Sequence, residues 1–173
     1  RGLGDVYKRQ GMLHILGNTI LLSVLVVAFA TLMAAPLAFL RAWTRFSSAN
    51  WIEIAVMIPF MTPPFAAAMA WMDFTRRGGV AEIRLGHGAG KLAHDAIYSV
   101  WGMAFIMAAE LFPFLYLILR TCLNSIPAST LEMAQIAGAS RWQQAVRIIA
   151  PNIIGPFSLG ALIIFIKAAG EFG

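Results

Sequence analysis

Charged residues, histidine and cysteine are all scarce in this sequence. Aspartate, glutamate, lysine and arginine make up 12% of its 173 residues, against about a quarter in a typical soluble domain. The single cysteine, Cys122, excludes an internal disulfide and a cysteine metal cluster. The surplus of 13 basic over 8 acidic residues is small and scattered, which argues against a nucleic-acid surface. Because 60% of the residues are hydrophobic, the sequence predicts a membrane protein.

The first ten residues, "RGLGDVYKRQ", are unlike everything after them. They are polar and basic, and the apolar run that follows is far too long for a signal peptide. Back-translated, they match a transposon-end adapter used in sequencing libraries and read through in frame. We therefore interpret residues 1–10 as an adapter artefact and residues 11–173 as a partial transmembrane domain. We expect further spans to be missing at both ends.

Four stretches are long and apolar enough, or nearly so, to cross a bilayer as helices, which takes roughly 20 residues each. They predict an all-α, polytopic membrane helix bundle. The polar, glycine-rich segment 73–95 is expected to form a loop with one short surface helix. Trp43, Trp51, Trp71 and Trp101 lie near span ends and are interpreted as interfacial anchors. The four predicted spans are 18–40, 52–72, 97–119 and 152–169.

Two of these spans contain residues that are costly in a membrane. Pro59, Pro63 and Pro64 remove backbone donors from the second span, and we favour a broken helix lining a translocation path over a tolerated kink. In the third span, Glu110 and Pro113 are further pathway candidates. Two structural alternatives remain open for the carboxylate: it fills the backbone gap at the proline, or it pairs with Lys167.

The segment between the third and fourth spans predicts two short helices with a sharp joint. Ser129 and Glu132 have the spacing of a capping box, so the first helix is expected to begin near Thr130. Gly138 can adopt the left-handed conformation that ends a helix. Ser140 and Gln143 offer a second capping box, after which the second helix is expected to run to Pro151.

The same segment, "EMAQIAGASRWQQAVRIIAP", resembles the EAA motif of permease subunits of binding-protein-dependent ABC importers. In that motif, Glu-Ala-Ala is followed at fixed spacing by Gly, by Ile and by Leu-Pro. Met133 and Ala150 depart from it, both as apolar replacements. Five positions match at the family's spacing: Glu132, Ala134, Gly138, Ile148 and Pro151.

The resemblance implies that segment 127–151 is a coupling loop that contacts a cytoplasmic ATPase dimer. Arg141 and Trp142 are expected to join the five matched residues in that contact, although the tryptophan could instead pack on the adjoining membrane helices. ATP would bind the partner ATPase, so this chain is expected to need no cofactor of its own. The counts of basic residues on the two sides differ by only one, and the resemblance places this loop in the cytoplasm.

The resemblance extends to a subgroup associated with ferric iron. It is carried by "GNTILLSVLVVAFATLMAAPLAF", "IPFMTPPFAAAMAW" and "AAELFPFLYLILRTCLNSIPAS". It implies a bacterial inner-membrane permease half, accompanied by a second half that is fused or separate. A periplasmic binding protein would deliver the substrate. A permease of the same build for polyamine, phosphonate or thiamine is the alternative.

Two other classes of protein remain as alternatives. An intramembrane enzyme would need a nucleophile and a base inside the spans; His14 has no convincing partner, and no catalytic residues are expected. A secondary transporter would use Glu110 and Lys167 as an ion relay. "GHGAGKL" fails as a phosphate loop, because Leu85 and Leu92 stand where glycine and a hydroxyl residue are needed. His87, His94 and Asp95 are interpreted as solvated residues without a metal.

Overall fold

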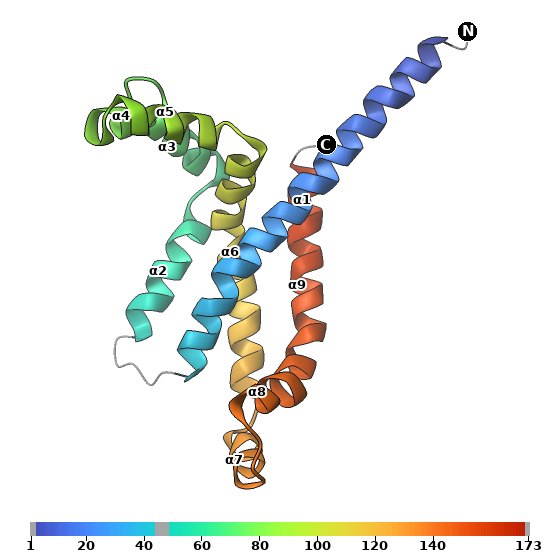
Figure 1. The fold of residues 1–173 in the computed structure, drawn as a ribbon, viewed down its shortest axis with the longest axis vertical. Helices are drawn as coiled ribbons and strands as arrows, with labels where there is room; N and C mark the ends of the chain where they lie inside the picture. The colour runs from blue at the N-terminus through green and yellow to red at the C-terminus, as the bar shows by residue number, and fades with distance from the viewer. Residues whose placement is uncertain (1–2, 44–48, 172–173) are drawn as a thin grey trace.

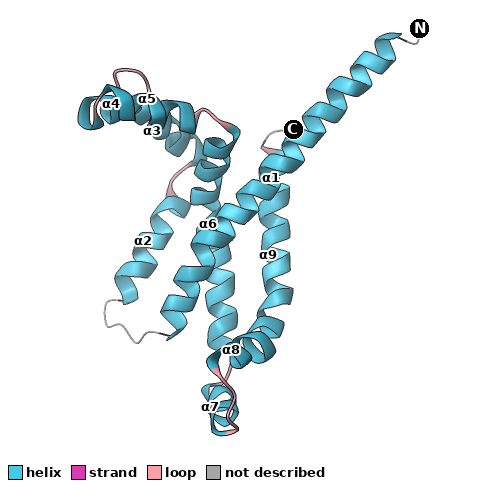
Figure 2. Cartoon of the chain, in the orientation of Figure 1, coloured by secondary structure: helices cyan, strands magenta, loops and turns pink. Residues whose placement is uncertain are grey.

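The computed structural model describes residues 3–43 and 49–171, and every regular element among them is helical (Figures 1 and 2). Arg1 and Gly2 of the decapeptide interpreted as an adapter lie outside these ranges. The all-α prediction is confirmed. In chain order the elements are α1 Leu3–Trp43, α2 Ala49–Met61, α3 Pro64–Thr75, α4 Val80–Leu85, α5 His87–Ile97, α6 Val100–Ser125, α7 Ala128–Ile136, α8 Arg141–Gln144, the π-helical turn η1 Ala145–Ile149 and α9 Ala150–Gly170.

Three of the predicted spans are continuous helices of sufficient length and apolarity. They cover His14–Ala42, Val100–Ser125 and Arg141–Gly170. The second predicted span is instead a bent pair, α2 and α3, whose axes differ by 95°. The 13 residues of α2 rise only about 20 Å at 1.5 Å per residue, less than the roughly 30 Å hydrocarbon layer. The bent pair therefore counts as a fourth span only if both helices are taken together.

Prolines explain the bend between α2 and α3. The helix ends at Met61, and Pro63 takes an extended conformation, with φ −59° and ψ 134°, before α3 begins at Pro64. Neither proline has an amide hydrogen to continue the ladder of α2, whereas the first turn of a helix tolerates proline. The expected broken helix is confirmed.

The core of the bundle is the packing of α1 against α6. Along α1 the buried apolar side chains recur every fourth residue, and three of them, Ala30, Ala34 and Ala38, are fully buried alanines. Ala104 and Ala108 are their fully buried counterparts on α6. Small residues allow two membrane helices to approach closely. Farther along, larger side chains of α6, Leu115 and Tyr116, fill the core.

The two ends of the bundle carry different elements. Helices α7 and α8 extend from the end at which α1 finishes, whereas α3, α4 and α5 gather at the opposite end (Figure 1).

Segment 73–95 contains two short helices, α4 and α5, where the sequence predicted one. Gly86, with φ 86°, separates α4 from α5. Without this glycine a single longer helix would be favoured.

Candidate functional site

The joint after α7 is a Schellman motif. Gly138 has φ +83°, and its amide donates to the Gln135 carbonyl oxygen at 3.0 Å. The next amide, of Ala139, reaches back to the Ala134 carbonyl oxygen at 2.9 Å. These two bonds satisfy carbonyls at the end of α7 that the helix itself leaves free. The prediction that Gly138 ends the first helix is confirmed.

The two predicted capping boxes have opposite outcomes. The Gln143 amide donates to Ser140 Oγ at 3.3 Å and the Ser140 amide donates to Gln143 Oε1 at 2.8 Å, so the second box is confirmed. The first box is wrong. Helix α7 begins at Ala128 with Pro127 as its N-cap, and no side chain caps it. Ser129 consequently lies inside the first turn, where its hydroxyl cannot take the capping position.

Helix α8 does not end at Pro151, which corrects the expected boundary. It continues through η1 into α9, so that Arg141–Gly170 is one long helical element. Within the turn, the Ala150 amide donates to the Ala145 carbonyl oxygen, five residues back. A π-turn of this kind lets a helix pass a proline, whose ring would otherwise clash with the carbonyl four residues before it. Segment 127–151, called the coupling segment after the role that the resemblance implies, is thus joined to the last membrane helix without a break.

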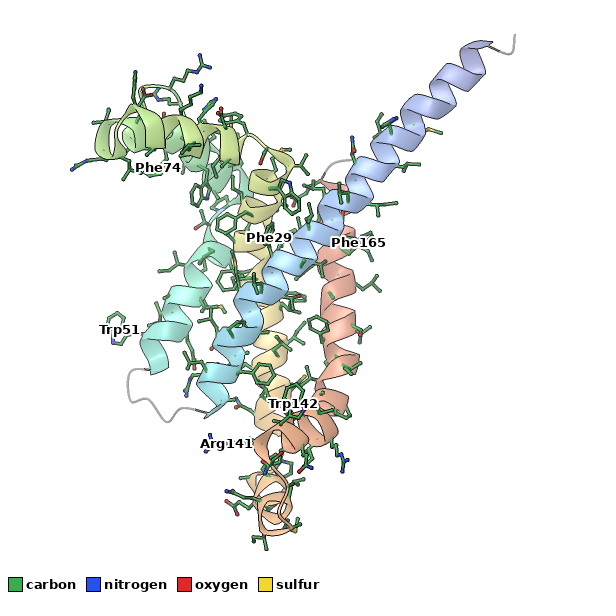
Figure 3. All side chains as sticks on the ribbon, in the orientation of Figure 1. Phe29, Trp51, Phe74, Arg141, Trp142 and Phe165 are labelled. Carbon is green, nitrogen blue, oxygen red and sulfur yellow. The ribbon has the colours of Figure 1, made fainter. Side chains whose placement is uncertain are left out.

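Apolar side chains of α7 and α8 are exposed. Met133 is 62% exposed, Ile136 87% and Trp142 76%, and Figure 3 shows Arg141 and Trp142 at the end of the bundle that carries α7. Trp142 therefore does not pack on the membrane helices described here. A group of large exposed apolar side chains is typical of a surface that contacts another protein or a membrane.

The other residues proposed for coupling lie along the same segment. Glu132 is exposed and Ala134 is half-buried on α7, whereas Ile148 is half-buried in η1 and Pro151 is exposed at the start of α9. Beside them, a groove of about 340 Å³ lies between α7 and α8. Leu131, Arg141, Gln144 and Ile149 line this groove.

A second candidate site is an open cleft of about 310 Å³ between α2, α3 and α6. Two predicted pathway residues, Glu110 and Pro59, line it together. Glu110 is half-buried and lies close to the middle of α6. We call this the Glu110 cleft. Its complete lining is Ile58, Pro59, Thr62, Ala67, Trp71, Ile106, Ala109, Glu110 and Phe112.

Glu110 does not form the ion pair with Lys167 that was one of its structural alternatives. The ion pairs within 4.0 Å among the described side chains are Arg41–Glu53, Arg120–Glu53, Arg76–Asp73 and His87–Glu82. The carboxylate therefore faces the cleft without a salt-bridge partner in the described part of the chain.

The remaining pathway candidates do not share this cleft. Pro113 is fully buried in α6 among core residues, and Pro63 is exposed at the break between α2 and α3. Pro64 begins α3, and its side chain lies outside the described residues. Only Glu110 and Pro59 are brought together at one surface, and the pathway role of the other prolines stays a prediction.

Trp71 is a wall of the Glu110 cleft rather than a simple interfacial anchor. Its ring meets Phe105 of α6 edge to face, with centroids 6.4 Å apart. Phe105 in turn meets Phe29 of α1 at 6.2 Å, and Phe29 meets Trp101 at 6.4 Å. Edge-to-face pairs favour defined geometries. This chain of rings ties α3 to α6 and α1, whereas Trp51 is 75% exposed and points away from the bundle (Figure 3).

Glu53 is a residue that sequence reasoning missed. Its Oε1 atom lies 2.7 Å from Arg120 Nη2 of α6 and 3.4 Å from Arg41 Nε of α1. One carboxylate thus joins α2 to the two central helices at the end of the bundle that carries α7 (Figure 1). A lone acid near a span end gives no sequence signal of this kind, because its partners come from distant segments.

The polar loop region at the opposite end has no cluster of three metal-ligating residues in the part of the chain described. His94 Nδ1 lies 3.1 Å from the Thr75 carbonyl oxygen, and its ring is 4.4 Å from that of Tyr98. His87 pairs with Glu82. The glycine-rich stretch that was dismissed as a phosphate loop follows a helix, α4, and not a strand.

The fold and the two sites define a multi-pass membrane protein with an exposed helical segment at one end and a charged cleft inside. Residues 26–173 match the family described as "Binding-protein-dependent transport system inner membrane component". The chain belongs to this family.

Individual relatives differ in the substrate that their names state. A probable sulfate transport system permease protein cysT of Zygnema circumcarinatum is 27% identical over 86% of this chain and 52% of its own length. An Fe(3+)-transport system permease protein FbpB 2 of Haemophilus influenzae is 27% identical over 98% of this chain and 30% of its own length. The Escherichia coli sulfate permease CysT is 24% identical over 83% of this chain. The chain thus spans about half or less of the length of these relatives.

Proposed function

We propose that this chain is the central part of one permease half of an ATP-driven ABC importer of the bacterial inner membrane. The observation that carries the proposal is the segment Ala128–Gln144, whose capped helices expose Met133, Ile136 and Trp142. An ATPase that docks there would push on a rigid element, because α8 continues into α9. ATP hydrolysis itself would take place on a separate ATPase dimer.

Two further partners follow from family membership. A periplasmic binding protein would deliver the substrate to the end that carries α3, α4 and α5, and a second permease half would complete the path. Ferric iron is the substrate that we propose, supported by the ferric relatives and by the subgroup resemblance. Sulfate, the substrate in the names of other relatives, is the competing candidate.

Capture of the ATPase tests the proposal. The full-length permease carrying Gly138→Asp is purified, and the ATPase encoded beside it is measured in the eluate. Gly138 has open space around it, so a partner backbone can approach there, and an added carboxylate would exclude it. We expect capture to be lost. Gly86→Asp, at an equally open glycine with φ +86° at the opposite end, introduces the same backbone strain; it is the control and should capture normally.

Unchanged capture by Gly138→Asp would contradict the coupling role. A secondary transporter driven by Glu110 and Lys167 is the second candidate, and it would need no ATPase at all. Uptake that persists after the ATPase gene is deleted would favour it.

A further inference from the structure

We propose that the Glu110 cleft is a cation-selective part of the translocation path, in which the Glu110 carboxylate supplies the fixed negative charge. This inference rests on the proposed function, since it takes the chain to be a permease. It goes further by assigning the selection between a cation and an oxyanion, which family membership leaves open, to one side chain of this cleft.

The first argument is the charge of the cleft lining. Glu110 is its one ionisable residue, and none of the lining residues is lysine, arginine or histidine. The hydroxyl of Thr62 donates to the Ile58 carbonyl oxygen at 3.0 Å, within its own helix. A sulfate ion here would meet a like charge in a surrounding of low dielectric, with no cationic side chain in the cleft lining to compensate. A cation would instead neutralise the carboxylate.

The second argument is a backbone acceptor in the same lining. Pro113 has no amide hydrogen, so the carbonyl group of Ala109, four residues earlier, cannot receive its usual helical hydrogen bond. Ala109 lines the cleft beside Glu110. Groups freed by proline in membrane helices are satisfied by neighbouring helices, by hydroxyl side chains or by water. Ala109 thus adds, next to Glu110, a backbone acceptor that has no amide donor within its own helix.

The third argument is the aromatic wall. Trp71 lines the cleft and is held edge to face by Phe105 and Phe74, each with ring centroids 6.4 Å away. The face of a tryptophan ring attracts cations, metal-bound or organic. No group of three metal-ligating residues exists among the described side chains. One carboxylate holds a cation only weakly, as passage through a path requires.

Uptake by the complete importer tests the inference. The full-length permease, its ATPase and its binding protein are reconstituted in proteoliposomes, and ATP-dependent uptake of ⁵⁵Fe(III), ¹⁴C-spermidine and ³⁵S-sulfate is measured. We expect uptake of one of the two cations, which also separates a metal from an organic ammonium. Glu110→Gln should lower it about tenfold, Glu110→Asp should retain most of it, and Asp95→Asn, an exposed acid outside the membrane, should leave it unchanged. Uptake of sulfate alone, or of neither cation, overturns the inference.

A binding measurement without ATP keeps this result separate from the proposed function. The same three probes are bound to the detergent-solubilised complex in a scintillation proximity assay, while ATP hydrolysis stimulated by the binding protein is recorded independently. If hydrolysis is not stimulated but cation binding still depends on Glu110, the importer proposal fails and the cation site stands. If hydrolysis is stimulated and Glu110→Gln binds the cation like the wild type, the importer proposal stands and the cation site fails.

A folding control accompanies Glu110→Gln. Its unfolding in detergent, followed by circular dichroism, should match that of Glu110→Asp. If Glu110→Asp is equally folded but binds the cation no better than Glu110→Gln, a charge-selective cleft is contradicted.

Discussion

The coupling segment and the Glu110 cleft are built in different ways. In the coupling segment, each stabilising hydrogen bond joins residues that are three to five apart in the chain, as between Ala139 and Ala134 or between Gln143 and Ser140. The cleft instead gathers side chains from α2, α3 and α6, which are separated by long stretches of sequence. The segment proposed to contact an ATPase is therefore held by local interactions, whereas the cleft proposed as a translocation path exists only after the helices have packed.

This difference can be tested first with two tryptophans. Trp71→Ala should lower the free energy of unfolding by about 2 kcal/mol, because it removes a half-buried ring that packs on Phe105 and Phe74. Trp142→Ala should leave stability unchanged, since its side chain is 76% exposed, but should reduce capture of the ATPase. Circular dichroism during unfolding in detergent, together with the capture assay, measures both. Equal loss of stability in the two variants would contradict the view that Trp71 supports helix packing and Trp142 does not.

A somewhat smaller loss of stability is expected when the ion pairs between α2 and the two central helices, α1 and α6, are removed. Glu53→Gln removes the charge that holds Arg120 and Arg41 and should cost about 1 to 2 kcal/mol, less than a fully buried pair because these side chains are 25–29% exposed.

Asp73→Asn is the matched control for that variant. It breaks an ion pair with Arg76 whose side chains are 65–69% exposed, so the free energy of unfolding should not change measurably. If the two variants behave alike, Glu53 does not fasten α2 to the bundle.

The smallest effect is expected within the coupling segment itself. Ser140→Ala removes a capping hydroxyl that accepts from the Gln143 amide and should cost about 1 kcal/mol of local stability. Ser129→Ala, at the position where the predicted cap is absent, should cost nothing. Hydrogen exchange of the amides in α7 and α8 measures the local opening free energy. Similar exchange in both variants would mean that the capping box does not hold the segment.

The two serines also show how far sequence reasoning reaches. Both were predicted to cap helices because each has the same spacing to a Glu or Gln. The prediction for Ser129 was wrong, because α7 begins at Ala128, with Pro127 as its N-cap, two residues earlier than expected. Gly138 was predicted correctly, since a left-handed residue after a helix is a local requirement. The end of the second helix was misplaced, because a π-turn lets the chain continue past Pro151.

The sequence by itself determined that this is an all-α membrane protein, that the second span is broken, and that segment 127–151 carries a family motif. These features depend on apolar run length, on proline and glycine, and on short-range spacing, all of which can be read along the chain. The packing of the helices decided that Glu110 lines a cleft together with Pro59 and Trp71 and forms no ion pair with Lys167. It also decided that Glu53 joins α2 to α1 and α6. The physical reason is that these contacts depend on how the helices rotate and cross, and close packing between whole helix faces sets those angles.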